Sequence, residues 1–375
     1  MKWQMVDLFG QYQKIQNEID QSILNVVKST AYINGPEVQN FKIHLEKYLG
    51  VKHVIPCANG TDALQIAFMA LNLKPGDEVI VPAFTYVATA EVIALLKLTP
   101  VMIDVNLNDF NLIVHEIEAA ITPKTKAIVP VHLFGQCAEM EAIMALADKY
   151  NLFVIEDNAQ AIGADYYFKD GRKKKAGTIG HIGCTSFFPS KNLGCFGDGG
   201  AICTDDDELA KSMTMVANHG QSVRYYHDVV GINSRLDTIQ AAILNVKLKY
   251  LDEYILARIQ AADYYDQGFS SISEIITPYR AEHSNHVFHQ YTLRITNGKR
   301  DKLKEYLDQK GIPCAIYYPV PLYEQKAFSD SGSNTNYLPV TDQLCKEVIS
   351  LPIHTELTKE IQGIFINEVI HFLQN

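Results

Sequence analysis

The chain of 375 residues lacks the features of several protein classes. Its seven cysteines are an odd number and show no C-x-x-C spacing, which argues against a disulfide framework and a structural zinc site. Acidic residues outnumber basic ones by 43 to 33, so the formal net charge is −10. This charge disfavours bulk attraction to nucleic acid or to anionic membranes. An anionic ligand would therefore need a local binding site.

Long hydrophobic runs and nucleotide-binding glycine motifs are also missing. No apolar run approaches the ~18 residues that a membrane span needs. The N-terminal sequence MKWQMVDLFGQ does not resemble a secretory signal, so we expect a cytoplasmic protein. Neither G-x-G-x-x-G nor G-x-x-x-x-G-K-[ST] occurs, which disfavours dinucleotide and nucleoside-triphosphate binding. No pair of histidines has metal-ligand spacing, so no metal site is expected.

Short apolar runs alternate with segments of helical pattern through the first half of the chain. We expect strands at 53–57, 78–81, 100–105, 127–131 and 152–155, with helices at 62–71, 87–96, 114–121 and 139–150. Two further helices, at 8–28 and 37–48, precede them. This alternation predicts an α/β fold with a mostly parallel sheet.

The pattern changes after residue 184. We expect strands at 185–188, 200–204, 287–295 and 312–318, and helices at 236–267, 300–310 and 358–373. The stretch SDSGSNTN, at 329–336, predicts a mobile loop. We place a large domain at residues 1–250 and a smaller α/β domain at 251–375.

Ligands of open α/β sheets bind beyond the carboxyl ends of the strands, so the residues that follow each strand matter most. Gly60 and Thr61 open a helix after the first strand, where free N–H groups suit a phosphate. An ordinary helix cap would use the same residues. Tyr86 follows the next strand, where it could stack on a flat heterocycle or simply pack in the core.

Two charged residues occupy equivalent positions further along the chain. Asp157 ends an apolar strand, so its carboxylate needs a cationic partner unless it only caps a helix. Lys191 lies in Phe-Phe-Pro-Ser-Lys, before a glycine-rich turn. A lysine in an apolar pocket has a lowered pKa and can form a Schiff base, whereas most single lysines lie on the surface. Together, the pair Gly60-Thr61 with Tyr86, Asp157 and Lys191 supplies the groups that pyridoxal 5′-phosphate (PLP) requires.

In this combination and order, the sequence resembles the DegT/DnrJ/EryC family of sugar aminotransferases, which are fold-type-I PLP enzymes. The similarity covers nearly the whole chain and rests on eight motifs. They are CANGTDAL (57–64), VPAFTYVATAE (81–91), PVHLFGQ (130–136), IEDNAQAIGA (155–164), TSFFPSKNLGCFGDGGAI (185–202), NHG (218–220), GINSRLDTIQAA (231–242) and YYPVPLY (317–323). The resemblance implies an aspartate-aminotransferase-like, three-layer PLP-binding domain and a small C-terminal domain.

The resemblance also implies roles for single residues. Lys191 would form the imine with the cofactor and move the proton during the reaction. Asp157 would pair with the pyridine nitrogen, Gln160 would bond the ring hydroxyl, and Tyr86 would stack on the ring.

The phosphate ligands implied by the resemblance are Gly60, Thr61 and Ser186, together with Asn233 from a second subunit. The chain would therefore form a homodimer with shared active sites.

Transamination is favoured because Lys191 is present, whereas a dehydratase branch of the family has His at this position. The reaction would be ping-pong, with L-glutamate as the amino donor. Within the family, the sequence is most similar to aminotransferases that act on UDP-2-acetamido-2-deoxy-3-oxo-glucuronate in surface-polysaccharide biosynthesis. Arg235 could bind the uronate carboxylate or could be a structural arginine at a helix start.

Other substrates and functions stay open. Tyr317 and Tyr318 stand where the family has His-Tyr, which keeps a neutral dTDP-3-keto- or 4-keto-6-deoxyhexose as an alternative substrate. His219 and His289 could contact sugar or phosphate, and His132 is expected to be structural. A PLP-binding regulatory or scaffold protein without turnover, or a PLP enzyme of elimination or dehydration, are further alternatives.

Overall fold

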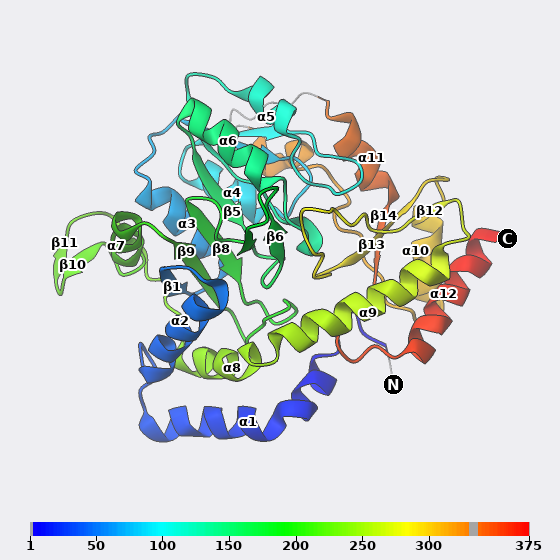
Figure 1. The fold of residues 1–375 in the computed structure, drawn as a ribbon, viewed down its shortest axis with the longest axis horizontal. Coiled ribbons are helices and arrows are strands. Elements are labelled where there is room, and N and C mark those ends of the chain that lie inside the picture. Colours follow the sequence, from blue (N-terminus) through cyan, green and yellow to red (C-terminus); the bar gives the residue numbers. More distant parts are fainter. Residues whose placement is uncertain (1–2, 330–336, 375) are drawn as a thin grey trace.

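A seven-stranded sheet forms the centre of the fold in the computed structural model, which describes residues 3–329 and 337–374 (Figure 1). Its order is β1-β9-β8-β5-β4-β2-β3. The strands are β1 (His53–Cys57), β2 (Glu78–Pro82), β3 (Thr99–Ile103), β4 (Thr125–Ile128), β5 (Phe153–Asp157), β8 (Ile182–Ser186) and β9 (Gly200–Thr204). Pairing from β3 to β8 is parallel, and β9 runs antiparallel to both of its neighbours. The predicted α/β fold with a mostly parallel sheet is confirmed.

Helices cover both faces of this sheet. The helices of this part are α1 (Leu8–Ser29), α2 (Pro36–Leu49), α3 (Gly60–Ala70), α4 (Ala88–Leu95), α5 (Val114–Ala120), α6 (Met140–Tyr150), α7 (Asp207–Val216), α8 (Thr238–Leu248) and α9 (Leu251–Phe269). Of these, α1 packs on α8 as an outer layer. Successive strand residues alternate between two cores, because side chains along a strand point to opposite faces. In β2, Ile80 packs into one core, while Val79 and Val81 pack into the other.

The predicted helix at 236–267 is two helices, so that prediction was wrong in one respect. α8 ends at Leu248 and α9 begins at Leu251. No proline or glycine marks the break. α8 packs on α1 and α2, whereas α9 crosses to the C-terminal part and contacts α12 (Lys359–Gln374) (Figure 1). The two packing directions, rather than a local signal, explain the break.

The C-terminal part has its own antiparallel sheet and core. The sheet joins β12 (Ile275–Ile276), β13 (Tyr291–Ile295) and β14 (Val348–Leu351), and α10 (Arg300–Gln309), α11 (Pro339–Glu347) and α12 surround it. The core of this part also receives Trp3, whose ring meets Phe365 edge-on at 5.2 Å. The predicted boundary after residue 250 stays a prediction.

Two strand predictions fail in this part. Residues 312–318 form only an isolated bridge between Ala315 and Ser350, and the strand that was not predicted, β14, pairs with β13 instead. Prolines at 313, 319 and 321 explain this, because proline donates no hydrogen bond to a ladder. The strand predicted from 287 begins only at Tyr291, since Phe288 has a positive φ of 47°. Most of the predicted mobile loop, at 330–336, lies outside the described residues.

Short elements complete the description. They are the hairpins β6 (Asp165–Tyr167) with β7 (Lys173–Lys175) and β10 (Gln221–Val223) with β11 (Tyr226–His227), and the 3-10 turns η1 (Leu133–Gly135), η2 (Leu322–Glu324) and η3 (Lys326–Phe328). All seven cysteines are buried and free. Across the described residues, no helix has the length and apolarity to cross a membrane.

Candidate active site

A cavity of about 610 Å³ lies beyond the carboxyl ends of β1, β2, β5 and β8. This volume is typical of a small-molecule site. Ten residues that the sequence predicts for the site line this cavity: Gly60, Thr61, Tyr86, Asp157, Gln160, Ser186, Lys191, His289, Tyr317 and Tyr318. The tertiary fold therefore brings together side chains that are up to 258 positions apart in the sequence.

One end of the cavity is built to hold an anion. The side chain of Asn59 caps α3 by accepting a hydrogen bond from the N–H of Asp62 at 2.8 Å. The first-turn N–H groups of Gly60 and Thr61 are thus left for a ligand, at the positive end of the helix dipole. A Cβ on Gly60 would lie only 2.7 Å from the Cβ of Ser186, so glycine is required for this close approach. The cradle of N–H and hydroxyl groups fits a phosphate.

Asp157 is held rigidly at the end of β5 and is 5% exposed. The hydroxyl of Thr89 donates to Asp157 Oδ2 at 2.7 Å, and the N–H of Ala159 donates to Oδ1 at 3.1 Å. Both partners are neutral, so the buried carboxylate suits a cationic group such as a protonated ring nitrogen. The sequence analysis missed Thr89. Its position in the first turn of the helix after Tyr86 was the available signal.

Lys191 lies in the loop after β8, with its Nζ 3.4 Å from Nε2 of His289. Desolvation lowers the pKa of Lys191 to about 8, although the charge of Asp157 opposes the shift. A substantial fraction of this amine is therefore neutral near pH 8, and the neutral form is the nucleophile. Burial, followed by the charges of Lys191 and Arg258, holds the pKa of His289 well below its usual value. His289 is thus a neutral neighbour of the amine.

Gln160 and Tyr318 form another part of the cavity wall. Gln160 Oε1 accepts a hydrogen bond from the N–H of Phe134 at 2.7 Å, and its Nε2 donates to the hydroxyl of Tyr318 at 3.1 Å. These bonds orient the amide, and Nε2 keeps a second proton for a ligand. The rings of Tyr86 and Tyr318 lie 6.4 Å apart. Tyr86 is 57% exposed in this single chain, which leaves its face available for stacking.

Three predicted residues, His219, Asn233 and Arg235, do not line the cavity of this single chain. His219 and Asn233 are exposed, and Arg235 is partly buried. They flank the β10–β11 hairpin, which projects beside α7 at the edge of the molecule (Figure 1). A contribution of Asn233 to the site of a second subunit stays a prediction, as do the substrate contacts of the other two residues.

Several lining residues carried no predicted site role. Asn59, Ser190, Asp198 and Gln290 add polar groups to the wall. Ser190 and Gln290 directly precede and follow predicted residues in the sequence, and this adjacency was the only signal for them. Among the described residues, no three His, Cys, Asp or Glu side chains gather to hold a metal ion.

Known proteins resemble this chain over nearly its whole length. It is 48% identical over 354 residues to the UDP-2-acetamido-2-deoxy-3-oxo-D-glucuronate aminotransferase of Pseudomonas aeruginosa, covering 94% of this chain and 96% of that protein. It is 43% identical to a protein of Geobacillus stearothermophilus named a pleiotropic regulatory protein, over 99% and 98% of the two chains. It is also 43% identical to the UDP-N-acetyl-3-dehydro-alpha-D-glucosamine 3-aminotransferase of Acidithiobacillus ferrooxidans, over 95% and 94%.

Solved structures agree with this similarity. A DegT DnrJ EryC1 StrS aminotransferase of Brucella abortus superposes with a TM-score of 0.93 at 41% identity, covering 99% of both chains. DesV of S. venezuelae, in complex with a ketimine intermediate, gives 0.94 at 36% identity over 100% of this chain and 99% of that one. NtdA of Bacillus subtilis, with bound cofactor PMP, gives 0.89 at 31% identity over 99% and 83%.

The family model of the DegT/DnrJ/EryC1/StrS aminotransferases matches residues 13–370. The predictions of a fold-type-I aminotransferase and of PLP as its cofactor are thereby confirmed at the level of the family. The chain belongs to the DegT/DnrJ/EryC1/StrS aminotransferase family.

Proposed function

We propose that this enzyme transfers an amino group from L-glutamate to the keto sugar of UDP-2-acetamido-2-deoxy-3-oxo-glucuronate. The observation that carries the proposal is the convergence of Lys191, Asp157 and Gln160 on one cavity whose far end is a helix N-terminus. The substrate is supported by the similarity to the P. aeruginosa enzyme at 48% identity. The product would be a 3-amino sugar for surface polysaccharide.

Each part of the cavity has a role in holding PLP, which supplies an electron sink for the carbanion when bound. Asp157 would bind the protonated ring nitrogen, and Gln160 would donate to the ring hydroxyl through Nε2. Tyr86 would cover one face of the ring. The cradle of Gly60, Thr61 and Ser186 would hold the phosphate.

Lys191 is the base of the proposed reaction. Its pKa of about 8 keeps part of the amine neutral, so the amine can take a proton from one carbon and return it to another. The neutral His289, 3.4 Å from Nζ, can hold the amine in place by hydrogen bonding. Because the donor product would leave the cavity before the acceptor sugar enters it, the kinetics would be ping-pong.

The shared site is part of the proposal. We infer a homodimer in which Asn233 of one chain completes the phosphate cradle of the other and Arg235 meets the uronate carboxylate. The exposed position of Asn233 in the single chain accords with a ligand for a neighbouring subunit. Tyr317 and Tyr318 would face the sugar as neutral groups.

The test begins with the cofactor. The purified protein should turn yellow with PLP, and borohydride should fix the cofactor on Lys191, as read from peptide masses. A protein that PLP does not colour would contradict the proposal.

The substrate is tested next, with glutamate and a panel of nucleotide ketosugars. The UDP-linked 3-oxo uronate should react fastest. Faster turnover of a neutral dTDP-linked keto-6-deoxyhexose would support the alternative substrate. PLP binding without amine transfer to any sugar would favour a regulatory role. The G. stearothermophilus relative is named a pleiotropic regulatory protein.

A further inference from the structure

Glu156 is a second carboxylate directly beside Asp157 on β5, and the proposed reaction does not use it. Successive strand residues point to opposite faces, so Asp157 lines the cavity while Glu156 points away from it. The side chain of Glu156 is 0% exposed. A buried carboxylate is costly unless hydrogen bonds satisfy it fully, so its partners need an explanation.

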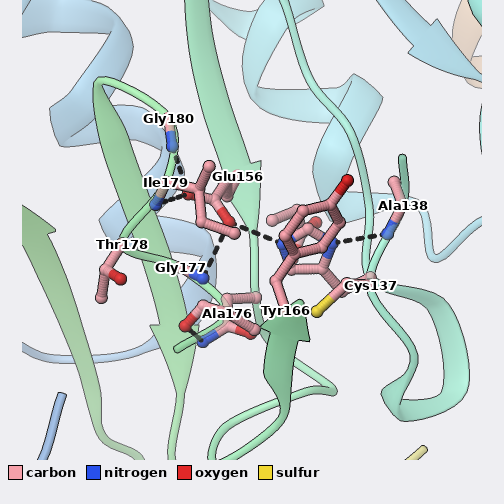
Figure 2. A network of polar contacts seen from close by, with 12 residues as sticks. Cys137, Ala138, Glu156, Tyr166, Ala176, Gly177, Thr178, Ile179 and Gly180 are labelled. Carbon is pink, nitrogen blue, oxygen red and sulfur yellow. Dashed lines mark hydrogen bonds and ion pairs between the residues drawn. The ribbon is translucent and has the colours of Figure 1, made fainter. Parts of the chain in front are cut away.

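Four N–H donors saturate Glu156, and Figure 2 shows the backbone nitrogens of Gly177, Ile179 and Gly180 converging on it. Oε1 accepts from Ile179 at 2.6 Å and from Gly180 at 2.5 Å. Oε2 accepts from Gly177 at 2.8 Å and from Nε2 of His132 at 2.7 Å. Each oxygen therefore faces two donors.

The backbone also decides the protonation of His132. Its Nδ1 accepts a hydrogen bond from the N–H of Ala138 at 3.2 Å, so Nδ1 carries no proton and Nε2 does. His132 is thus a neutral donor to Glu156. Burial alone would raise the pKa of Glu156, but the interactions with His132, followed by the hydrogen bonds of the backbone N–H groups of Gly180 and Gly177, lower it. Glu156 is a buried anion held by hydrogen bonds.

The segments that Glu156 ties together are the ones that carry the site. The backbone N–H of His132 donates to the carbonyl of Asp157 at 3.1 Å, and two residues later the N–H of Phe134 donates to Gln160 Oε1. The segment 177–180 leads directly into β8, which ends at Ser186. One buried carboxylate thus connects the backbone segment 132–134, which hydrogen-bonds to Asp157 and Gln160, with β8, the strand that precedes Lys191.

We propose that Glu156 and His132 form a positioning pair that aligns Asp157 and Gln160 for the cofactor ring. The inference rests on the proposed function, because it concerns the placement of the groups that would bind PLP. Neither residue lines the cavity, so both act through the backbone.

The substitution Glu156→Gln tests the pair because it preserves shape and removes one acceptor. Whichever way the new amide turns, its NH₂ group faces two N–H donors. If His132 instead carried its proton on Nδ1, this proton would face the N–H of Ala138, so two donors would again face each other. We expect the affinity of the apoenzyme for PLP to fall ~10-fold or more. We also expect the pH midpoint of the visible absorbance of bound PLP to shift.

A matched control separates positioning from general destabilisation. Glu347 is a largely buried carboxylate of the C-terminal part, 15% exposed and 2.9 Å from Arg294, and it does not line the cavity. Glu347→Gln should lower the thermal midpoint of unfolding but leave the Kd for PLP within about twofold of the wild type.

A second pair of variants keeps the test decisive if Glu156→Gln does not fold. His132→Ala leaves Glu156 its three backbone donors and should also weaken PLP binding, whereas His132→Gln retains a donor and an acceptor and should restore most of it. Wild-type affinity and an unshifted pH midpoint in Glu156→Gln or His132→Ala would overturn the inference. A wild-type protein that fails to bind PLP would instead overturn the proposed function.

Discussion

The cavity at the strand ends and the segment around the β10–β11 hairpin both carry predicted site residues, but only those at the strand ends line a cavity of the single chain. The cavity gathers ten predicted residues, and several of them are fixed by hydrogen bonds. The segment 218–235 carries three predicted residues outside the cavity. It also exposes large apolar side chains, including Tyr225 at 75% and Val230 at 86%. Such a patch typically marks a contact surface.

The difference accords with our proposal that the residues of one site come from two subunits. The sheet edge assembles its residues because parallel strands end at the same edge. The predicted residues that flank the hairpin lie outside this cavity and accord with a role in a neighbouring copy. The following predictions test whether the cavity is complete in function as well as in geometry, and whether the hairpin serves another chain.

The largest effect is expected at the centre of the cavity. Lys191→Ala should lower amine transfer on the order of 10³-fold or more, because it would remove both the proposed covalent anchor and the proposed base. Borohydride should then fix no cofactor to the chain. Steady-state kinetics and peptide mass spectrometry measure the two outcomes.

Lys247 provides the matched control for this experiment. Its pKa is also lowered to about 8, by desolvation, yet it donates to the carbonyl of Gly194 at 2.6 Å and does not line the cavity. Lys247→Met should retain the borohydride-fixed cofactor on Lys191. Labelling of Lys247 in the wild type would show that a lowered pKa, rather than position, selects the lysine.

A smaller and selective effect is expected at Arg235. If its guanidinium meets a uronate carboxylate, Arg235→Ala should reduce kcat/KM for the uronate substrate roughly 10- to 100-fold. A neutral keto-6-deoxyhexose should be affected far less. Parallel assays with the two substrates measure the difference, and equal losses would count against the carboxylate contact.

Asn233→Ala should weaken PLP binding by about 10-fold, since it would remove one proposed phosphate ligand. At a PLP concentration too low to fill the Asn233→Ala site, mixing this variant with Lys191→Ala should restore activity. Random pairing would leave about a quarter of the sites intact, because each mixed dimer has one complete site.

The control mixture combines Lys191→Ala with Asp157→Asn, two changes that belong to the same chain's cavity. No mixed dimer of these chains has a complete site, so activity should stay low. Restoration in this control, or its absence with Asn233→Ala, would show that the hairpin does not serve the partner.

The smallest effect concerns pH. If the neutral amine of Lys191 forms the proposed imine with PLP, the rate of PLP capture by the apoenzyme should rise with pH, with a midpoint near 8. The charge of Asp157 raises the pKa of Lys191, so Asp157→Asn should move the midpoint lower. Stopped-flow absorbance measures both curves, and Lys247→Met should leave the midpoint unchanged.

Much of the site could be predicted because its chemistry is local in sequence. Asp157 ends one apolar strand and Lys191 follows another, and the two strands end at one edge of the sheet. The contact of Thr89 with Asp157 and that of His289 with Lys191 could not be predicted, since each joins side chains from distant segments. The break between α8 and α9 was not predicted either, because it depends on packing against distant helices.

The amino-acid sequence by itself determined the alternation of strands and helices, the aminotransferase family and the residue types that suit PLP. These follow from periodicity and from short motifs, which need no partner elsewhere in the chain. Only the tertiary structure decided that Glu156 is held by the loop at 177–180 and by His132. It also decided that Asn233 lies on the surface. Both depend on which distant segments pack together, and burial and hydrogen bonding across the whole fold select that packing.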